Sequence, residues 1–132
     1  MLKSPLTLRG ILAVIAGLFL PQFSTAEEDR FAFFESRIRP VLVKHCYECH
    51  SSQSPELKGA LSLENSVSLQ KGGDSGPVLV SGQPTKSLLI AAMKYEGLEM
   101  PPKGRLPDEV IRDFEKWIEM GAPDPRSEVA TK

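Results

Sequence analysis

The two cysteines of this 132-residue chain are separated by two residues and followed directly by a histidine, in the run Cys46-Tyr47-Glu48-Cys49-His50. Two thiols at this spacing lie on one helical turn, and each can form a thioether to a vinyl group of the same porphyrin. The adjacent imidazole is then held beneath the iron and can bind it. This order of residues is the pattern of c-type haem attachment. It predicts one covalent haem c, attached through Cys46 and Cys49, with His50 as an iron ligand.

Three other uses of a Cys-x-x-Cys pair compete with haem attachment. A redox dithiol needs a βαβ context of the thioredoxin type, and the chain has no such pattern. A structural zinc ion needs four ligands, and only His45 remains beside His50. A simple disulfide leaves the histidine after the second cysteine unexplained. Haem attachment is therefore favoured over all three.

A low-spin electron carrier needs a second axial ligand, and four side chains are candidates: His45, Met93, Met100 and Met120. His45 precedes the attachment motif and lies on the wrong side of the ring. Met93 falls on an apolar helical face and Met120 at a helix end, where methionine commonly fills gaps in a core. Met100 precedes two prolines that stiffen its loop and limit the movement of the sulfur. The sequence therefore predicts Met100 as the distal ligand.

The first element that must position this site is a helix over residues 27–43. Its apolar residues recur at three- and four-residue steps and form one face: Phe31, Phe34, Ile38 and Leu42. Pro40 has no N–H to donate, so we expect it to kink or restart this helix just before the haem motif.

The remaining elements are shorter, except the last. Asn65 can cap a brief helix that Gly72-Gly73 would end, and a second short helix is expected over residues 88–93. The clearest helix follows Pro107 and ends at Gly121, with one apolar stripe made of Val110, Ile111, Phe114, Trp117 and Ile118. No alternating pattern is long enough for a sheet-based fold. We expect an all-α domain of three to five helices with long loops around one covalent haem.

The first 26 residues have the features of a targeting signal rather than of a folded domain. Lys3 and Arg9 precede an apolar run over residues 11–20, and small residues lead to Ala26. This predicts a secretory signal peptide over residues 1–26, cleaved after Ala26, and a domain over residues 27–132. A retained anchor is the alternative, but ten apolar residues span only about half of a ~30 Å hydrocarbon core. We expect a periplasmic or otherwise exported protein, attached to a membrane only if the signal stays uncleaved.

The charge balance excludes several classes of partner. The chain has 16 Lys and Arg against 17 Asp and Glu, a net charge of -1. Neither nucleic acid nor a membrane surface is favoured by such a balance. Outside the signal the chain is poor in apolar residues, so we expect the porphyrin to complete the core through Phe34, Leu42, Leu61, Leu79 and Leu89.

Several stretches outside the haem motif carry a family resemblance. They are residues 34–42, 58–63, 72–77, 81–84, 87–89, 100–103 and 117–123. With the haem motif, they resemble the planctomycete-type cytochrome c domain over nearly the whole of residues 27–132. The resemblance implies a small class I-like cytochrome c fold, with Cys46 and Cys49 as attachment sites, His50 as proximal ligand and Met100 as distal ligand.

A further part of the resemblance concerns the proximal histidine. The run Gly76-Pro77-Val78-Leu79 resembles the Gly-Pro-x-Leu segment of class I cytochromes, whose proline carbonyl accepts a hydrogen bond from the proximal imidazole. It implies that the Pro77 oxygen accepts from Nδ1 of His50. Such bonds to an iron-binding histidine fix its orientation.

These observations point to an electron carrier rather than an enzyme. A carrier needs both axial positions of the iron filled, and Met100 favours this case. The alternative is a haem peroxidase or a gas or redox sensor with a displaceable distal ligand. We expect a monomer that meets redox protein partners, and Lys94, Lys103 and Arg105 around the Met100 segment could meet an acidic one.

Overall fold

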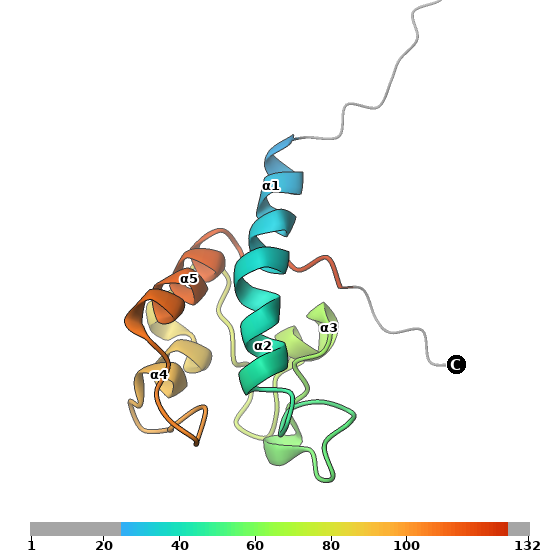
Figure 1. Ribbon diagram of the computed structural model, residues 1–132, viewed down its shortest axis with the longest axis vertical. Helices are drawn as coiled ribbons and strands as arrows, with labels where there is room; N and C mark the ends of the chain where they lie inside the picture. The colour runs from blue at the N-terminus through green and yellow to red at the C-terminus, as the bar shows by residue number, and fades with distance from the viewer. Residues whose placement is uncertain (1–24, 127–132) are drawn as a thin grey trace, which may run out of the picture.

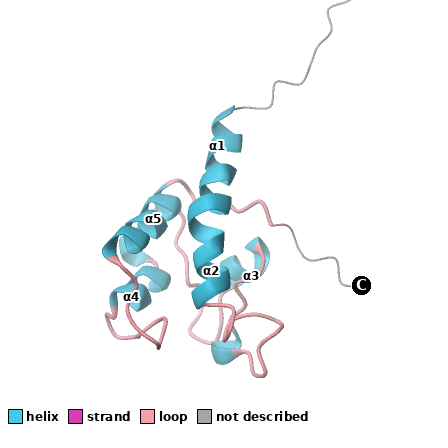
Figure 2. Ribbon diagram, in the orientation of Figure 1, coloured by secondary structure: helices cyan, strands magenta, loops and turns pink. Residues whose placement is uncertain are grey.

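The computed structural model describes residues 25–126, which fold into helices joined by long loops (Figures 1 and 2). The helices are α1 (Thr25–Phe33), α2 (Arg39–His45), α3 (Ser66–Lys71), α4 (Leu88–Lys94) and α5 (Asp108–Glu119). A π-helical turn, Phe34–Ile38, joins α1 to α2, and 3-10 turns span Lys58–Ala60 and Pro84–Lys86. No strand occurs among these residues, so the prediction of an all-α domain with three to five helices is confirmed for them.

The N-terminal helix runs without a break in direction through α1, the π turn and α2 (Figure 1). The π turn ends two residues before Pro40, at Ile38, and the N–H of Arg39, which follows it, donates to the oxygen of Phe34, five residues earlier. Because proline has no N–H, the usual bond to the residue four positions back is missing at Pro40. The α-helical hydrogen-bond pattern is therefore interrupted and restarts at α2, as predicted, but through a wider turn and without a kink (Figure 1).

The short helix α3 is bounded by the two caps that the sequence predicts. The Oδ1 atom of Asn65 accepts from the N–H of Ser68 at 2.8 Å and starts α3. Gly72 ends that helix with a φ of 76°, a left-handed conformation that glycine adopts without a Cβ clash. The cap places the next residues, 73–76, in a tight loop that reaches the candidate site.

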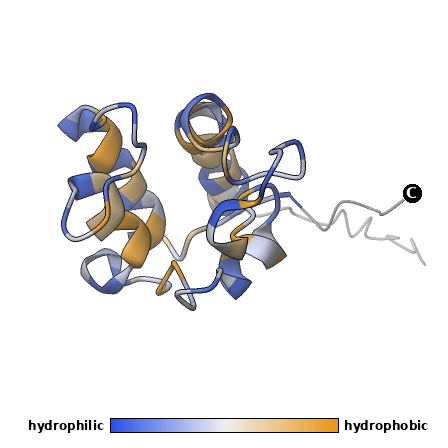
Figure 3. Ribbon diagram, turned by 90° about the horizontal axis from the view of Figure 1, so that it is seen from below, coloured by the Kyte–Doolittle hydropathy of each residue, from blue (hydrophilic) through white to orange (hydrophobic). Residues whose placement is uncertain are grey.

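The core lies where α5 crosses the N-terminal helix. The rings of Phe34 and Trp117 are 5.7 Å apart, and Phe114 meets Trp117 edge-on at 6.0 Å. Trp117 is fully buried, and its Nε1 donates to the oxygen of Pro123 at 2.9 Å. The first and last helices thus pack against each other, with Trp117 as a core residue. In Figure 3 the hydrophobic stretches concentrate in the helices and the connecting loops are largely hydrophilic.

The helices divide into two groups around the N-terminal helix. α4 and α5 pack together on one side of it, and α3 lies on the other side (Figures 1 and 3). No helix within residues 25–126 is long and apolar enough to cross a bilayer. The predicted signal peptide lies outside the described residues apart from Thr25 and Ala26, which begin α1.

Candidate haem-binding site

An apolar cavity of about 490 Å³ lies between the turn that follows α2, the loops on either side of α3, and α4. This volume falls in the range of sites for small molecules and cofactors, roughly 300–1,000 Å³. Its wall includes the chemistry-bearing residues that the sequence singles out, Cys46, Cys49, His50 and Met100. The rest of the wall is mostly apolar and includes Leu61, Leu63, Val78, Leu88, Leu89, Leu98, Leu106 and Phe114. The fold therefore brings the predicted ligands to a single apolar space.

The haem motif forms a helix-like turn that continues from α2. The N–H of Cys46 donates to the oxygen of Leu42 at 2.9 Å, and the N–H of His50 donates to the oxygen of Cys46 at 2.9 Å. The turn puts both thiols and the imidazole on the cavity wall. Both cysteines are free, so they form no disulfide in this structure. Burial, and then the neighbouring Cys49, raise the pKa of the Cys46 thiol to about 11.

His50 is held by a short extended segment, residues 61–63, that lies against it. The Nδ1 atom of His50 is 3.2 Å from the oxygen of Leu61, and the N–H of Leu63 donates to the oxygen of His50 at 2.9 Å. A carbonyl oxygen can only accept, so Nδ1 must carry the proton. The lone pair of Nε2 is then left for a metal, which is the arrangement of an iron-binding histidine.

The partner of Nδ1 corrects one prediction. The sequence resemblance assigns this role to Pro77, but the structure gives it to Leu61. Pro77 is exposed, and only its neighbours Gly76 and Val78 reach the cavity wall. The physical reason is the bond between Leu63 and His50, which pins residues 61–63 beside the imidazole and leaves the loop at Pro77 farther along the wall.

Two glycine-containing loops support the Leu61 segment from outside. The N–H of Asp74 donates to the oxygen of Gly59 at 2.8 Å. A Cβ placed on Gly73 would lie 2.2 Å from that same oxygen and 3.0 Å from the Cβ of Leu61. Only glycine lets the two backbones approach this closely. The glycines that follow α3 therefore fix the position of Leu61 relative to the His50 ring.

The loop that carries Met100 is anchored to α4. The N–H of Met100 donates to the oxygen of Ala92 at 3.1 Å, and the hydroxyl of Tyr95 donates to the oxygen of Pro101 at 2.5 Å. Both Met100 and Met93 lie on the cavity wall. Met93 is 4% exposed and Met100 is 37% exposed. The structure thus places two of the candidate methionines and His45 on the cavity wall, and the choice of Met100 as ligand stays a prediction.

The positive residues around Met100 are all paired with acids of the same chain. Lys94 contacts Glu115 at 2.6 Å, Lys103 contacts Glu48 at 2.5 Å, and Arg105 contacts Asp108 at 2.7 Å. The Lys103 pair joins the Met100 loop to the haem motif. Each of these cations thus makes an ion pair within the chain, and the expectation that they meet an acidic partner stays a prediction.

The residues of the cavity fit a covalently attached haem. Two free thiols, a histidine with Nε2 available, and a methionine share one apolar wall. Among residues 25–126, no group of three or more His, Cys, Asp or Glu side chains is placed to hold a bare metal ion. Of the five apolar contacts expected for the porphyrin, only Leu61 and Leu89 line the cavity. The expectation was wrong for Phe34, Leu42 and Leu79, because Phe34 and Leu42 are used in the protein core and Leu79 faces a separate small cavity.

Comparison with known proteins supports this reading of the site. Residues 46–104 match the family described as planctomycete cytochrome C. The match begins at Cys46 and includes His50, the Leu61 segment, the glycine loop and Met100. The resemblance noted in the sequence is confirmed over these residues. No curated protein and no solved structure matches the chain.

Proposed function

We propose that this chain, whose residues 46–104 match the planctomycete cytochrome C family, is an exported monohaem c-type cytochrome that carries single electrons between redox proteins. A cytochrome c family domain indicates haem-based electron transfer in general terms. The observation that carries the specific proposal is that Cys46, Cys49 and His50 share one apolar cavity with Met100.

Each of these residues has a defined task in the proposal. Cys46 and Cys49 hold the haem through thioethers, and His50 binds the iron through Nε2 while Leu61 fixes its ring. Met100 binds from the loop anchored on Ala92 and Tyr95. When bound, the haem supplies an iron that gains and loses one electron reversibly, and a methionine ligand favours its reduced state.

The protein around the cavity controls access to it. The apolar wall excludes water, which raises the cost of charge at the centre and contributes to a high reduction potential. Leu98 and Met100, at 43% and 37% exposed, make part of this wall reach the surface. Electrons can then pass at this rim without a loop having to open. We place a redox protein partner there and expect the carrier to act as a monomer.

A second candidate is a haem sensor or peroxidase with a displaceable distal ligand. The partial exposure of Met100 is the observation in its favour, because an exposed ligand is more easily replaced. Peroxide chemistry also needs an acid or base near the iron. The described residues on the cavity wall include no aspartate or glutamate, but His45 lies there and can act as an acid or a base. The carrier is therefore favoured by Met100 and not by a lack of such groups.

One preparation tests both parts of the proposal. The exported protein should keep the mass of one haem in strong denaturant, and the Cys46→Ala, Cys49→Ala double variant should release it. The visible spectrum of the wild type should be that of a six-coordinate, low-spin c-type haem in both oxidation states. Free thiols on both cysteines in the matured protein would exclude a c-type cytochrome. A high-spin ferrous form that binds carbon monoxide readily would favour the sensor or peroxidase.

A further inference from the structure

Arg126 is a charged residue whose side chain is almost completely buried beside the haem motif. Its side chain is 8% exposed, and that of its partner Asp124 is 2% exposed. The two form a double contact, in which Nε donates to Oδ1 at 2.9 Å and Nη2 donates to Oδ2 at 2.6 Å. Burial alone would lower the pKa of Arg126, but the hydrogen bonds and charge of Asp124 hold it above its ordinary value. Arg126 is therefore a permanent cation inside the fold.

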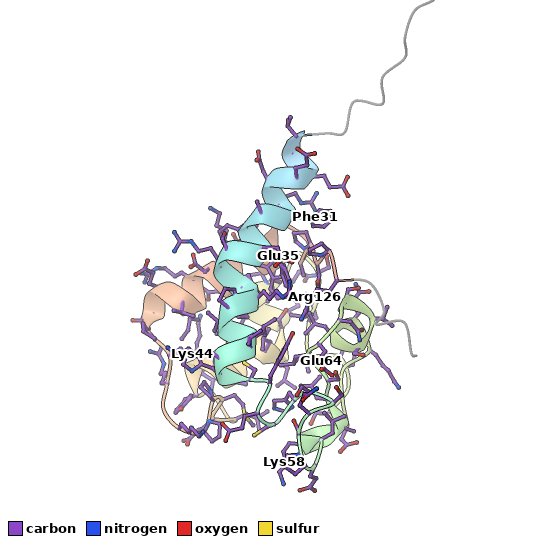
Figure 4. The ribbon with its side chains drawn as sticks, turned by 45° about the vertical axis from the view of Figure 1, so that its right-hand side comes forward. Phe31, Glu35, Lys44, Lys58, Glu64 and Arg126 are labelled. Carbon is purple, nitrogen blue, oxygen red and sulfur yellow. The ribbon has the colours of Figure 1, made fainter. Side chains whose placement is uncertain are left out.

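The third nitrogen of the Arg126 guanidinium, Nη1, is directed at the haem motif and at the segment of residues 61–63. Nη1 donates to the hydroxyl oxygen of Tyr47 at 2.6 Å and to the carbonyl oxygen of Leu63 at 2.7 Å. The guanidinium also lies over the ring of Phe34, 4.7 Å from its centre. Figure 4 shows Arg126 between the N-terminal helix and the α3 region. One side chain thus connects the Cys-x-x-Cys turn to residues 61–63.

Both segments that Arg126 joins make hydrogen bonds with His50. Tyr47 lies within the turn whose Cys46 oxygen accepts from the N–H of His50 at 2.9 Å. Leu63 donates to the oxygen of His50 at 2.9 Å, and Leu61, two residues earlier, accepts from its Nδ1 at 3.2 Å. The position of the Leu61 oxygen relative to the imidazole depends on how these two segments are held together. Arg126 is the only side chain among residues 25–126 that is hydrogen-bonded to both Tyr47 and Leu63.

We propose that Arg126 is a positioning residue that holds the Leu61 oxygen at Nδ1 of His50 and thereby lowers the reduction potential of the haem. This inference rests on the proposed function. A hydrogen bond from Nδ1–H makes the imidazole a stronger electron donor, which stabilises the ferric iron. A longer or more variable bond to Leu61 removes part of that effect. Loss of the Arg126 contacts therefore raises the potential, although the hydrogen bonds of the Arg126 side chain go to Asp124, Tyr47 and Leu63 and not to the residues expected to hold the haem.

The arrangement requires arginine and not only a positive charge. Three nitrogens of the guanidinium point in three fixed directions, so two of them bind Asp124 while the third serves Tyr47 and Leu63. A lysine has one nitrogen at the end of a flexible chain and cannot serve both sets of partners. Arg126→Lys consequently keeps the charge opposite Asp124 and loses the link between the two segments.

The test compares three variants of the haem-loaded protein. Arg126→Lys should raise the reduction potential and speed the exchange of the His50 Nδ1 proton with solvent, followed by NMR of the ferrous form. Tyr47→Phe removes one of the two links without leaving a buried charge, and should change both quantities in the same direction by less. Arg39→Lys is the matched control, because Arg39 is exposed and, among residues 25–126, forms an ion pair with Glu35 alone, at 2.9 Å. It should leave both quantities at their wild-type values.

The possible outcomes separate this inference from the proposed function. If the wild type carries covalent haem and both Arg126→Lys and Tyr47→Phe keep its potential and proton exchange, the inference is wrong and Arg126 only stabilises the fold. If Arg126→Lys fails to fold, Tyr47→Phe decides alone, and an unchanged potential overturns the inference. If the wild type carries no covalent haem, the proposed function itself has failed, and the inference fails with it.

Discussion

The Nδ1 atom of His50 lies 3.2 Å from the carbonyl oxygen of Leu61, eleven residues farther along the chain. This contact gives the imidazole its proton at Nδ1 and its free lone pair at Nε2. It exists because the backbone of residues 61–63 is held from two directions, by Arg126 at Leu63 and by the glycine loop at Gly73. The chemistry of the candidate site therefore depends on segments that contain none of the expected iron ligands.

Replacement of Gly73 by alanine should displace the Leu61 segment. The added Cβ would lie 2.2 Å from the backbone oxygen of Gly59, which is shorter than real Cβ contacts. It would also lie 3.0 Å from the Cβ of Leu61, so the clash falls on the Leu61 segment itself. We expect a loss of roughly 1–3 kcal/mol in the free energy of unfolding, measured by denaturant titration of the haem-loaded protein. We also expect a higher reduction potential, because the Leu61 oxygen moves away from His50.

Gly82→Ala is the control for this prediction. Gly82 has a φ of 73°, so alanine is strained there by roughly 1–2 kcal/mol, but no atom lies within 4 Å of the added Cβ. Its stability loss should resemble that of Gly73→Ala, while its potential should stay at the wild-type value. Equal potentials in both variants would contradict the role assigned to the glycine loop.

Much of the fold could be predicted because its signals are local. Asn65 and Gly72 bound α3 by chemistry that depends on a few neighbouring residues, and the interruption before Pro40 follows from one missing N–H. Phe34 and Trp117, which are in contact, each lie on an apolar stripe that the sequence shows by its three- and four-residue spacing. In such cases, the residue type itself carries the information.

The partners of the site could be predicted less well, because backbone acceptors and buried charges have no such signature. The oxygen of Leu61 is chemically the same as that of Pro77, and only the three-dimensional path of the loop selects between them. Arg126 is one of 16 Lys and Arg residues, most of which are expected at the surface. The one feature of the sequence that could have indicated a buried Arg126 was the nearby Asp124, because a carboxylate two residues away can pair with a buried guanidinium.

The Cys46 thiol gives a pH dependence to the protein without haem. Its pKa is about 11 in the fold against an ordinary value of 9.0, so the folded chain holds this proton more tightly than the unfolded chain. Stability from this group is complete below pH 9.0 and is lost as the pH rises through about 11. The loss should reach about 2–3 kcal/mol.

Denaturant titrations of haem-free wild type and haem-free Cys46→Ala, across this pH range, measure the effect. The difference between the two chains removes the contribution of tyrosines and lysines that titrate in the same range. Covalent attachment replaces the S–H bond, so the haem-loaded protein should lack this step. A haem-free chain that keeps its helical circular dichroism and shows no difference from Cys46→Ala would contradict the prediction.

Tyr95→Phe should loosen the loop that carries Met100. The variant keeps the ring and removes the hydroxyl that donates to the oxygen of Pro101 at 2.5 Å. One hydrogen bond of this kind contributes about 0.5–1.5 kcal/mol to stability. We expect a loss of that size, together with faster binding of carbon monoxide to the ferrous protein because Met100 leaves the iron more often. An unchanged carbon monoxide rate alongside a normal spectrum would show that this bond does not hold the ligand.

The two methionines on the cavity wall should respond differently to truncation, although both lie near the site. Met93 is 4% exposed and packs in the core, so Met93→Ala leaves a cavity and should cost about 2–5 kcal/mol in unfolding free energy. Met100 is 37% exposed and contributes little to packing, so Met100→Ala should cost much less in stability. The same variant should open the sixth position of the iron, lower the reduction potential and let carbon monoxide bind, since the thioether that favours the reduced state is gone.

Spectra of the two variants, each recorded with and without carbon monoxide, separate the roles of Met93 and Met100. A Met93→Ala protein that binds carbon monoxide, beside a Met100→Ala protein that stays low-spin, would transfer the ligand role to Met93.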